Sequence, residues 1–198
     1  MRMYWKTSRG KAVAAAALLI AVALFAANCA GAKKPVKKTF KGAKMNWTIK
    51  SDSISENKRI PDKFTCKGTD ISPALSWDAA PKGAQELVLI MDDPDAPVGT
   101  WTHWIVYGIS PDRTSLPENV EKSAAAASVG ALQGVTSFRR PGYGGPCPPP
   151  GPAHRYFFKL FALDKKTGLP AGASLAQVEA AIKGHVIAEA KLMGTFSR

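Results

Sequence analysis

The segment Leu87–Ile109, LVLIMDDPDAPVGTWTHWIVYGI, has the clearest fold signal in this sequence. Within it, an apolar run, a turn rich in Asp and Pro, and a longer aromatic run follow one another directly. Short apolar runs separated by Pro, Gly and Asp are typical of β-strands joined by turns. The same pattern extends over the sequence from Trp47 onward. We therefore expect a mainly β domain, whose clearest strands are Leu87–Met91, Trp101–Ile109 and His154–Leu163.

The two aromatic strands, WTHWIVYGI and HRYFFKLFAL, are largely apolar on both faces. This composition predicts that they lie centrally, between packed layers. Side chains alternate between the two faces of a strand, so His103 is expected to share a face with Trp101, Ile105 and Tyr107.

One convincing helix follows these strands. Ser174 can cap it, and Leu175, Val178 and Ile182 recur at spacings of three and four residues. A second short helix is expected over His185–Lys191.

The basic charge of the chain is concentrated outside the predicted domain. The 198 residues contain 27 Lys and Arg against 15 Asp and Glu, a formal net charge of +12. Eleven of the basic residues and none of the acids lie in residues 1–50, so residues 51–198 hold 16 basic residues against 15 acids. A nucleic-acid-binding domain carries its charge on the fold itself. We therefore expect no nucleic-acid partner.

Residues 1–28 have the composition of an export signal, with a basic start and an apolar run over 12–27. The sequence around Cys29 resembles the lipobox of bacterial lipoproteins, so lipidation of Cys29 is expected. Two other outcomes stay open: cleavage after the Ala30–Ala32 triplet, or retention of the uncharged span Ala12–Ala32 as an anchor across a bilayer of about 30 Å. All three place the domain outside the cytoplasm, in the periplasm or the cell envelope, and the first and third tether it to a membrane.

Residues 29–46 are expected to form a flexible basic tether that leads to a domain over residues 47–198. The stretch KKPVKKTFKGAKMN, residues 33–46, has no acid and few apolar residues, so it cannot bury enough surface to become ordered. Its lysines either attract anionic lipid head groups, by about 1 kcal/mol each near a charged surface, or serve only as a solvated spacer.

Three segments of the predicted domain combine polar and rigid residues. Asp92–Pro97 holds three carboxylates within four residues, which repel one another unless donors or cations compensate them. His103 lies inside an aromatic strand. Arg139–Tyr156 is a loop rich in Gly and Pro, where glycines let backbone N–H groups approach a ligand and prolines stiffen the loop in advance. Each feature alone has a structural explanation, but their combination indicates a site.

These segments resemble the signature of the phosphatidylethanolamine-binding protein family, and most closely its bacterial Raf-kinase-inhibitor-like branch. Asp93–Pro97, DPDAP, resembles the first family motif, and Gly142–Tyr156, GYGGPCPPPGPAHRY, resembles the second. Further similar segments are Ile60–Cys66, Asp70–Trp77, Gly184–Ala190 and Gly194–Phe196. The resemblance covers about residues 46–198. It implies a β-sandwich with Greek-key-like connections and small peripheral α-helices.

The resemblance also implies a small pocket for phosphate or related anions. By motif position its residues are Asp93, Asp95, His103, Gly144, Pro146, His154 and Tyr156. In the expected arrangement the two aspartates orient His103 or His154 and raise the histidine pKa values, so that imidazolium N–H groups face the anion. The Tyr156 hydroxyl and the backbone N–H groups of Gly144 and Gly145 add neutral donors. Arg155 lies on the opposite strand face and is interpreted as an ion-pair or structural residue.

The expected function is non-enzymatic binding, without a cofactor, of a phosphate-bearing or similar anionic group on a lipid head group, a nucleotide or a phosphorylated protein. The resemblance also allows a protein-interaction module that inhibits a kinase or a protease. A metal site of two histidines and one aspartate has suitable ligands, but no short HxH or HExxH spacing supports it. A cysteine hydrolase using Cys147 is disfavoured, because that residue lies between two prolines and away from a helix N-terminus.

Two cysteines remain once Cys29 is lipidated or removed. Cys66 and Cys147 both lie next to pocket segments, and export takes them to an oxidising compartment. A Cys66–Cys147 disulfide is therefore expected.

Overall fold

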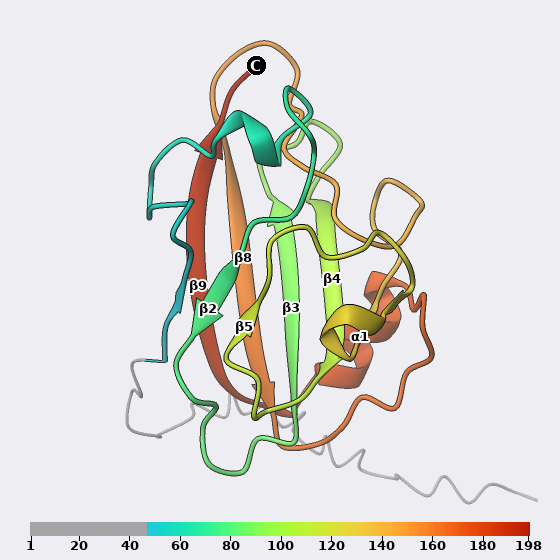
Figure 1. Cartoon of the computed structure of the whole chain (residues 1–198). Coiled ribbons are helices and arrows are strands. Elements are labelled where there is room, and N and C mark those ends of the chain that lie inside the picture. The colour runs from blue at the N-terminus through green and yellow to red at the C-terminus, as the bar shows by residue number, and fades with distance from the viewer. Residues whose placement is uncertain (1–46) are drawn as a thin grey trace, which may run out of the picture. The chain divides into compact units, whose positions relative to one another are not determined.

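The computed structural model describes residues 47–198, which form nine strands, one α-helix and two single-turn 3-10 helices (Figure 1). The predicted signal peptide, the lipidation site Cys29 and the tether lie outside the described residues. The strands are β1 (Ile49–Lys50), β2 (Leu75–Trp77), β3 (Glu86–Asp93), β4 (Trp101–Ile109), β5 (Ser115–Leu116), β6 (Ala125–Ala126), β7 (Ala131–Gln133), β8 (His154–Leu163) and β9 (Val186–Phe196). The helices are η1 (Asp62–Phe64), η2 (Ala127–Val129) and α1 (Leu175–Ile182).

The strands form two antiparallel sheets. The larger has the order β6-β7-β4-β3-β8-β9, and the smaller has the order β1-β2-β5. Figure 1 shows β2 and β5 in front of the larger sheet, and Leu75 and Trp77 of β2 share one buried cluster with Leu89, Trp104 and Phe158 of the larger sheet. The predicted mainly β fold and the central positions of both aromatic strands are therefore confirmed. Two sheets facing a common core are compatible with the predicted sandwich.

Helix α1 covers the other face of the larger sheet. Its start is specified locally, because Ser174 accepts from the backbone N–H of Gln177 while the Gln177 side chain accepts from the backbone N–H of Ser174. Val178 and Ile182 of the helix are buried in a second cluster with residues of β3 and β4 such as Val88. No helix within residues 47–198 has the length and apolar character needed to span a bilayer.

The prediction of a second helix over His185–Lys191 is wrong. Val186–Phe196 is strand β9, which pairs with β8 along its whole length from Leu163↔Val186 to His154↔Phe196. A short segment with apolar residues at mixed spacings fits either a helix or a strand. The long neighbouring strand β8 decides between them, because β9 completes its hydrogen bonds and buries Ala190 and Leu192 against the core.

A β-bulge at His103 changes the predicted faces of β4. Met91 pairs with Trp104, but the next residue of β3, Asp92, pairs with Thr102, so His103 is an extra residue on β4. One extra residue moves every following side chain to the opposite face.

The consequence of the bulge is visible in the packing. The ring of His103 lies on the face of Tyr156, with ring centroids 5.2 Å apart. Ile105 and Tyr107 instead belong to the cluster beneath α1. The expectation that His103 shares their face is therefore wrong, whereas Trp101, which precedes the bulge, lines the same cavity as His103.

Candidate functional site

A cavity of about 240 Å³ opens at the end of the larger sheet where β3 ends and β4 and β8 begin. Its polar lining consists of four residues that the sequence predicted for the site: Asp93, His103, His154 and Tyr156. Its other lining residues are Ala96, Pro97, Val98, Trp101, Phe138, Cys147, Pro148 and Pro149. The remaining predicted residues, Asp95, Gly144 and Pro146, support the cavity from outside its lining.

His154 is held by Asp93. The Nδ1–H of His154 donates to Asp93 Oδ2 over 2.8 Å, and both side chains are largely buried. The other carboxylate oxygen, Asp93 Oδ1, accepts from the backbone N–H of Asp95 over 2.8 Å. Both oxygens of this acid are therefore engaged, and Nε2 of His154 has no hydrogen-bond partner within residues 47–198.

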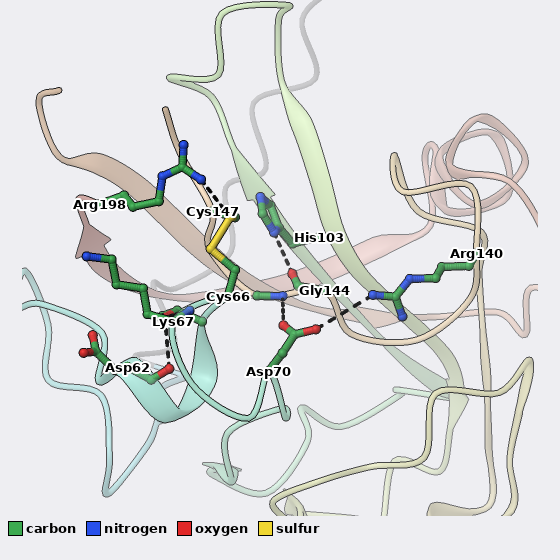
Figure 2. The surroundings of a disulfide bond; sticks show 11 residues. Asp62, Cys66, Lys67, Asp70, His103, Arg140, Gly144, Cys147 and Arg198 are labelled. Carbon is green, nitrogen blue, oxygen red and sulfur yellow. Dashed lines mark hydrogen bonds and ion pairs between the residues drawn. A yellow bond between two sulfur atoms is a disulfide. The ribbon is translucent and has the colours of Figure 1, made fainter. Parts of the chain in front are cut away.

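His103 is held by a backbone carbonyl and not by an aspartate. Its Nδ1–H donates to the carbonyl oxygen of Gly144 over 2.6 Å (Figure 2). Only 3% of the residue is exposed, and this burial lowers the pKa of His103 below its usual value of 6.5, although the Gly144 hydrogen bond and nearby acids such as Asp93 oppose the change. The predicted raised pKa of His103 is therefore wrong, because desolvation outweighs the carboxylates.

Tyr156 contributes an enclosed hydroxyl to the site. The residue is fully buried, and its hydroxyl has no hydrogen-bond partner among the described residues. Burial raises the pKa of Tyr156, and the negative charge of Asp93 adds to the effect. Tyr156 is therefore neutral at physiological pH. It packs edge-on against the imidazole of His103.

Two of the three neighbouring acids, Asp92 and Asp95, pair with a cation, whereas Asp93 binds His154. Asp92 and Asp93 are consecutive in β3 and point to opposite faces, where Asp92 pairs with Lys159 at 2.5 Å. Asp95 forms two hydrogen bonds with the Arg155 guanidinium, at 2.9 and 2.7 Å. These bonds lower the pKa of Asp95 to about 2. Asp95 therefore anchors the start of β8, where Arg155 is the ion-pair residue that alternation indicated, and it does not orient a histidine.

The glycine pair of the second motif supports the cavity wall. The Gly144 N–H donates to the His103 carbonyl (3.0 Å), and the Gly145 N–H donates to Asp70 Oδ1 (2.6 Å). Both N–H groups are therefore engaged inside the protein, and the expectation that they face a ligand is wrong. Asp70 also pairs with Lys122 (2.6 Å) and lies 3.8 Å from Arg140 (Figure 2). Sequence reasoning missed Asp70, because nothing local marks a contact with a residue 75 positions away.

Cys66 and Cys147 form a disulfide in the structure, with Cα atoms 5.4 Å apart. It joins the loop after η1 to the cavity wall (Figure 2). The N–H of Cys66 also donates to the carbonyl oxygen of Pro146 over 3.1 Å, so Pro146 fixes this junction from behind. In this state Cys147 has no thiol, which removes the nucleophile that a cysteine hydrolase requires. Among residues 47–198, no three His, Cys, Asp or Glu side chains gather as a metal site.

The aromatic wall was also missed by sequence reasoning. The ring of Phe138 packs edge-on against His103 and Trp101, with centroids 5.3 and 5.5 Å away. Alternation along the strand placed Trp101 on the face of His103, and this signal could have identified Trp101 as a lining residue. Phe138 comes from a loop far along the chain and has no comparable signal. The cavity thus combines two imidazoles and one engaged acid with apolar walls.

Comparison with known proteins agrees with this architecture. The family profile described as Phosphatidylethanolamine-binding protein matches residues 50–197. The chain belongs to this family. Over 150 residues it is 49% identical to a UPF0098 protein of Methanothermobacter thermautotrophicus, which covers 76% of this chain and 98% of that protein. A UPF0098 protein of Aquifex aeolicus is 47% identical over 150 residues, which cover 75% of this chain and 86% of that protein.

Two crystal structures extend the comparison to the phosphatidylethanolamine-binding protein fold. The first, from Chlamydia trachomatis and described as a homologue of the family, is 39% identical with a TM-score of 0.69, covering 77% of this chain and 97% of that chain. The second, E. coli YbcL, described as a new member of the mammalian family, is 29% identical with a TM-score of 0.72. The match covers 78% of this chain and 99% of that chain. The family resemblance predicted from the two motifs is thereby confirmed.

Proposed function

We propose that the cavity binds the anionic group of a phosphate-bearing or similar ligand and releases that ligand unchanged. The observation that carries the proposal is the pair of imidazoles, His103 and His154, that line one small cavity. Each ring is held through Nδ1, and no hydrogen bond within residues 47–198 engages Nε2. A ring fixed in this way presents Nε2 to a ligand without a further loss of side-chain freedom.

The charge of the cavity requires that anion binding be coupled to proton uptake. Asp93 is its one acidic lining residue among the described residues, so with both rings neutral the lining carries a net charge of −1. A neutral ring that donates from Nδ1 can only accept at Nε2. Protonation of His103 or His154 converts Nε2 to a donor and offsets the charge of Asp93. Because burial lowers the pKa of His103 in the free protein, we expect anion affinity to increase mainly below pH about 6.5.

Calorimetric titration tests this proposal with two probes whose charge is constant in this range, sulfate and the phosphodiester glycerophosphoethanolamine. Wild-type affinity should rise as the pH falls, and the apparent binding enthalpy should depend on the buffer, because protons are taken up. Loss of one charged hydrogen bond costs about 1.5–3 kcal/mol, which is about tenfold or more in affinity. His103→Ala and His154→Ala should each show such a loss.

His185→Ala is the matched control, because His185 pairs with Asp164 at an exposed position away from the cavity. It should bind both probes like the wild type. Binding that is independent of pH and equal in all four proteins contradicts the proposal and leaves His103 and His154 as structural core residues.

The chemical source of the anionic group is a separate comparison. The cavity is small and its rim is apolar, which suits one phosphate-sized group attached to a larger body. Glycerophosphoethanolamine, a mononucleotide and a phosphoserine peptide represent a lipid head group, a nucleotide and a phosphorylated protein. The family description, Phosphatidylethanolamine-binding protein, favours the first of these.

We also propose that the domain works outside the cytoplasm, tethered through its N-terminus. The basic and apolar leader before Cys29 supports export, and the Cys66–Cys147 disulfide is compatible with an oxidising compartment. Cell fractionation of wild type and Cys29→Ser tests the lipid anchor. A variant that stays as firmly in the membrane fraction as the wild type contradicts lipidation and favours a retained apolar helix.

A second candidate function, docking of a kinase or protease over the cavity, is favoured by the apolar rim. Val98 is 79% exposed beside Pro97 and Pro149. A pull-down from envelope extract compares the wild type with Val98→Asp. The candidate function requires a captured kinase or protease whose activity is inhibited by the wild type and not by the variant.

A further inference from the structure

The segment 147–153, CPPPGPA, forms the outer wall of the cavity and has few attachments to the rest of the fold. Cys147, Pro148 and Pro149 line the cavity. Four of the seven residues are prolines, which have no backbone N–H to donate. No backbone hydrogen bond between 147–153 and other described residues is formed. The disulfide to Cys66 and a contact with Arg198, both made by the Cys147 sulfur, hold the wall together with the burial of Pro148, whereas residues 149–153 are exposed.

The residues on either side of this wall are firmly anchored. Before it, Gly145 and Pro146 are hydrogen-bonded to Asp70 and Cys66. After it, His154 begins the long strand β8. The disulfide therefore lies at the point where the hydrogen-bonded glycine turn becomes a wall that has no backbone hydrogen bond to the other described residues. Breaking it releases the wall without removing any hydrogen bond of the two sheets.

The disulfide is accessible to a thiol from solution. Cys147 is exposed and Cys66 lies in the exposed loop after η1, and exposed disulfides are more readily reduced than buried structural ones. The Arg198 guanidinium lies 3.9 Å from Cys147 Sγ (Figure 2). A nearby positive charge stabilises a thiolate, and a stabilised thiolate leaves faster. Attack at Cys66 Sγ, with Cys147 as the leaving thiolate, is therefore the favoured direction.

We propose that the Cys66–Cys147 disulfide is a redox latch on the cavity, closed by oxidation and opened by a small-molecule thiol or dithiol. Two thiols of the reductant are oxidised to one disulfide, while the Cys66–Cys147 bond breaks and takes up two electrons and two protons to give two thiols. In the reduced state the wall is free, His103 and His154 are more accessible, and the cavity is less ordered for a ligand. The effect on ligand affinity rests on the proposed function; the opening of the wall does not.

The ligand-independent test measures the accessibility of the histidines. Diethyl pyrocarbonate modifies neutral imidazoles, and peptide mass spectrometry resolves His103, His154 and the exposed control His185. The purified protein is compared when oxidised, after reduction with millimolar glutathione without denaturant, and after reoxidation. Reduction should raise the modification rate of His103 and His154 by roughly tenfold relative to His185, because release of the wall uncovers both imidazoles. Reoxidation should restore the slow rate.

Variants separate the latch from a general effect of the reductant. Cys66→Ser combined with Cys147→Ser should show the fast rate in all three conditions, provided that its circular dichroism matches the wild type. If that variant does not fold, the reversible cycle of the wild type decides alone. Equal modification rates in the oxidised and reduced wild type, or a disulfide that resists glutathione until the protein is denatured, overturn the proposal.

The direction of attack and the ligand effect have their own measurements. Arg198→Gln should slow reduction of the native disulfide several-fold, whereas Lys67→Gln, which removes the charge of the residue that follows Cys66 in the chain, should not. Equal slowing by both contradicts the leaving-thiolate assignment. Glycerophosphoethanolamine should bind the reduced protein about tenfold more weakly than the oxidised protein. If neither form binds it but the histidine rates still change, the proposed function fails and the latch stands.

Discussion

Burial of His103 predicts a loss of stability in weak acid that no exposed histidine produces. The residue is 3% exposed and donates to the Gly144 carbonyl. Its pKa in the folded protein is lowered from the usual 6.5 by desolvation. In the unfolded chain the pKa returns to about 6.5. Between these two values the unfolded chain binds more protons than the folded protein, so the free energy of unfolding decreases as the pH falls.

The magnitude follows from this difference in bound protons. Within the window, one group costs up to about 1.4 kcal/mol of stability for each pH unit. Above pH about 6.5 His103 contributes no slope, and below its lowered pKa the loss is complete. Asp95 does not interfere, because its pKa is about 2 in the folded protein and its ordinary value is 3.8, which places its effect at lower pH.

Urea denaturation followed by tryptophan fluorescence, in buffers without phosphate or sulfate, measures this slope between pH about 4.5 and 7. His103→Gln removes the titrating group while keeping a side-chain N–H that can reach the Gly144 carbonyl. Its free energy of unfolding should lose the slope that the wild type shows. His185→Gln, which changes only an exposed histidine, should keep that slope. Parallel profiles for the wild type and His103→Gln refute the assignment of the buried, neutral ring.

Three further substitutions test the packing around the cavity. Gly145→Ala should lower the free energy of unfolding by about 2 kcal/mol in chemical denaturation, because an added Cβ lies 2.3 Å from the Phe64 carbonyl oxygen; an unchanged midpoint contradicts this. Gln133→Leu should lower the free energy of unfolding by about 3 kcal/mol, because the buried amide makes three hydrogen bonds. A variant as stable as the wild type contradicts this and shows that water replaces the amide. Asp95→Asn should reduce by about 1 kcal/mol the free energy of unfolding that is lost on acidification below pH about 4, after allowance for solvent screening of the Arg155 pair. A loss as large as that of the wild type contradicts the pairing.

Local sequence patterns were enough to predict the main strands, the helix and the family. The apolar and aromatic composition of residues 101–109 and 154–163 predicted β4 and β8 at their observed bounds. Ser174 and the spacing after it predicted α1, because a helix cap depends on residues only three positions apart. The two motifs, together with His103 in the strand that follows the first, also predicted four of the residues that line the cavity, since a motif preserves local spacing whatever surrounds it.

The partners and the protonation of those residues depend instead on contacts between distant segments of the folded chain. The bulge at His103 exists because β4 has one more residue than β3 between two paired positions. The sequence of either strand alone does not show this difference. The partner of His103 is a carbonyl 41 residues away, and its lowered pKa depends on burial that several distant segments create together. Residues 186–196 likewise form a strand and not a helix because they pair with the edge of β8. Local sequence determines backbone preference, but hydrogen-bond partners and desolvation depend on which distant segments pack together.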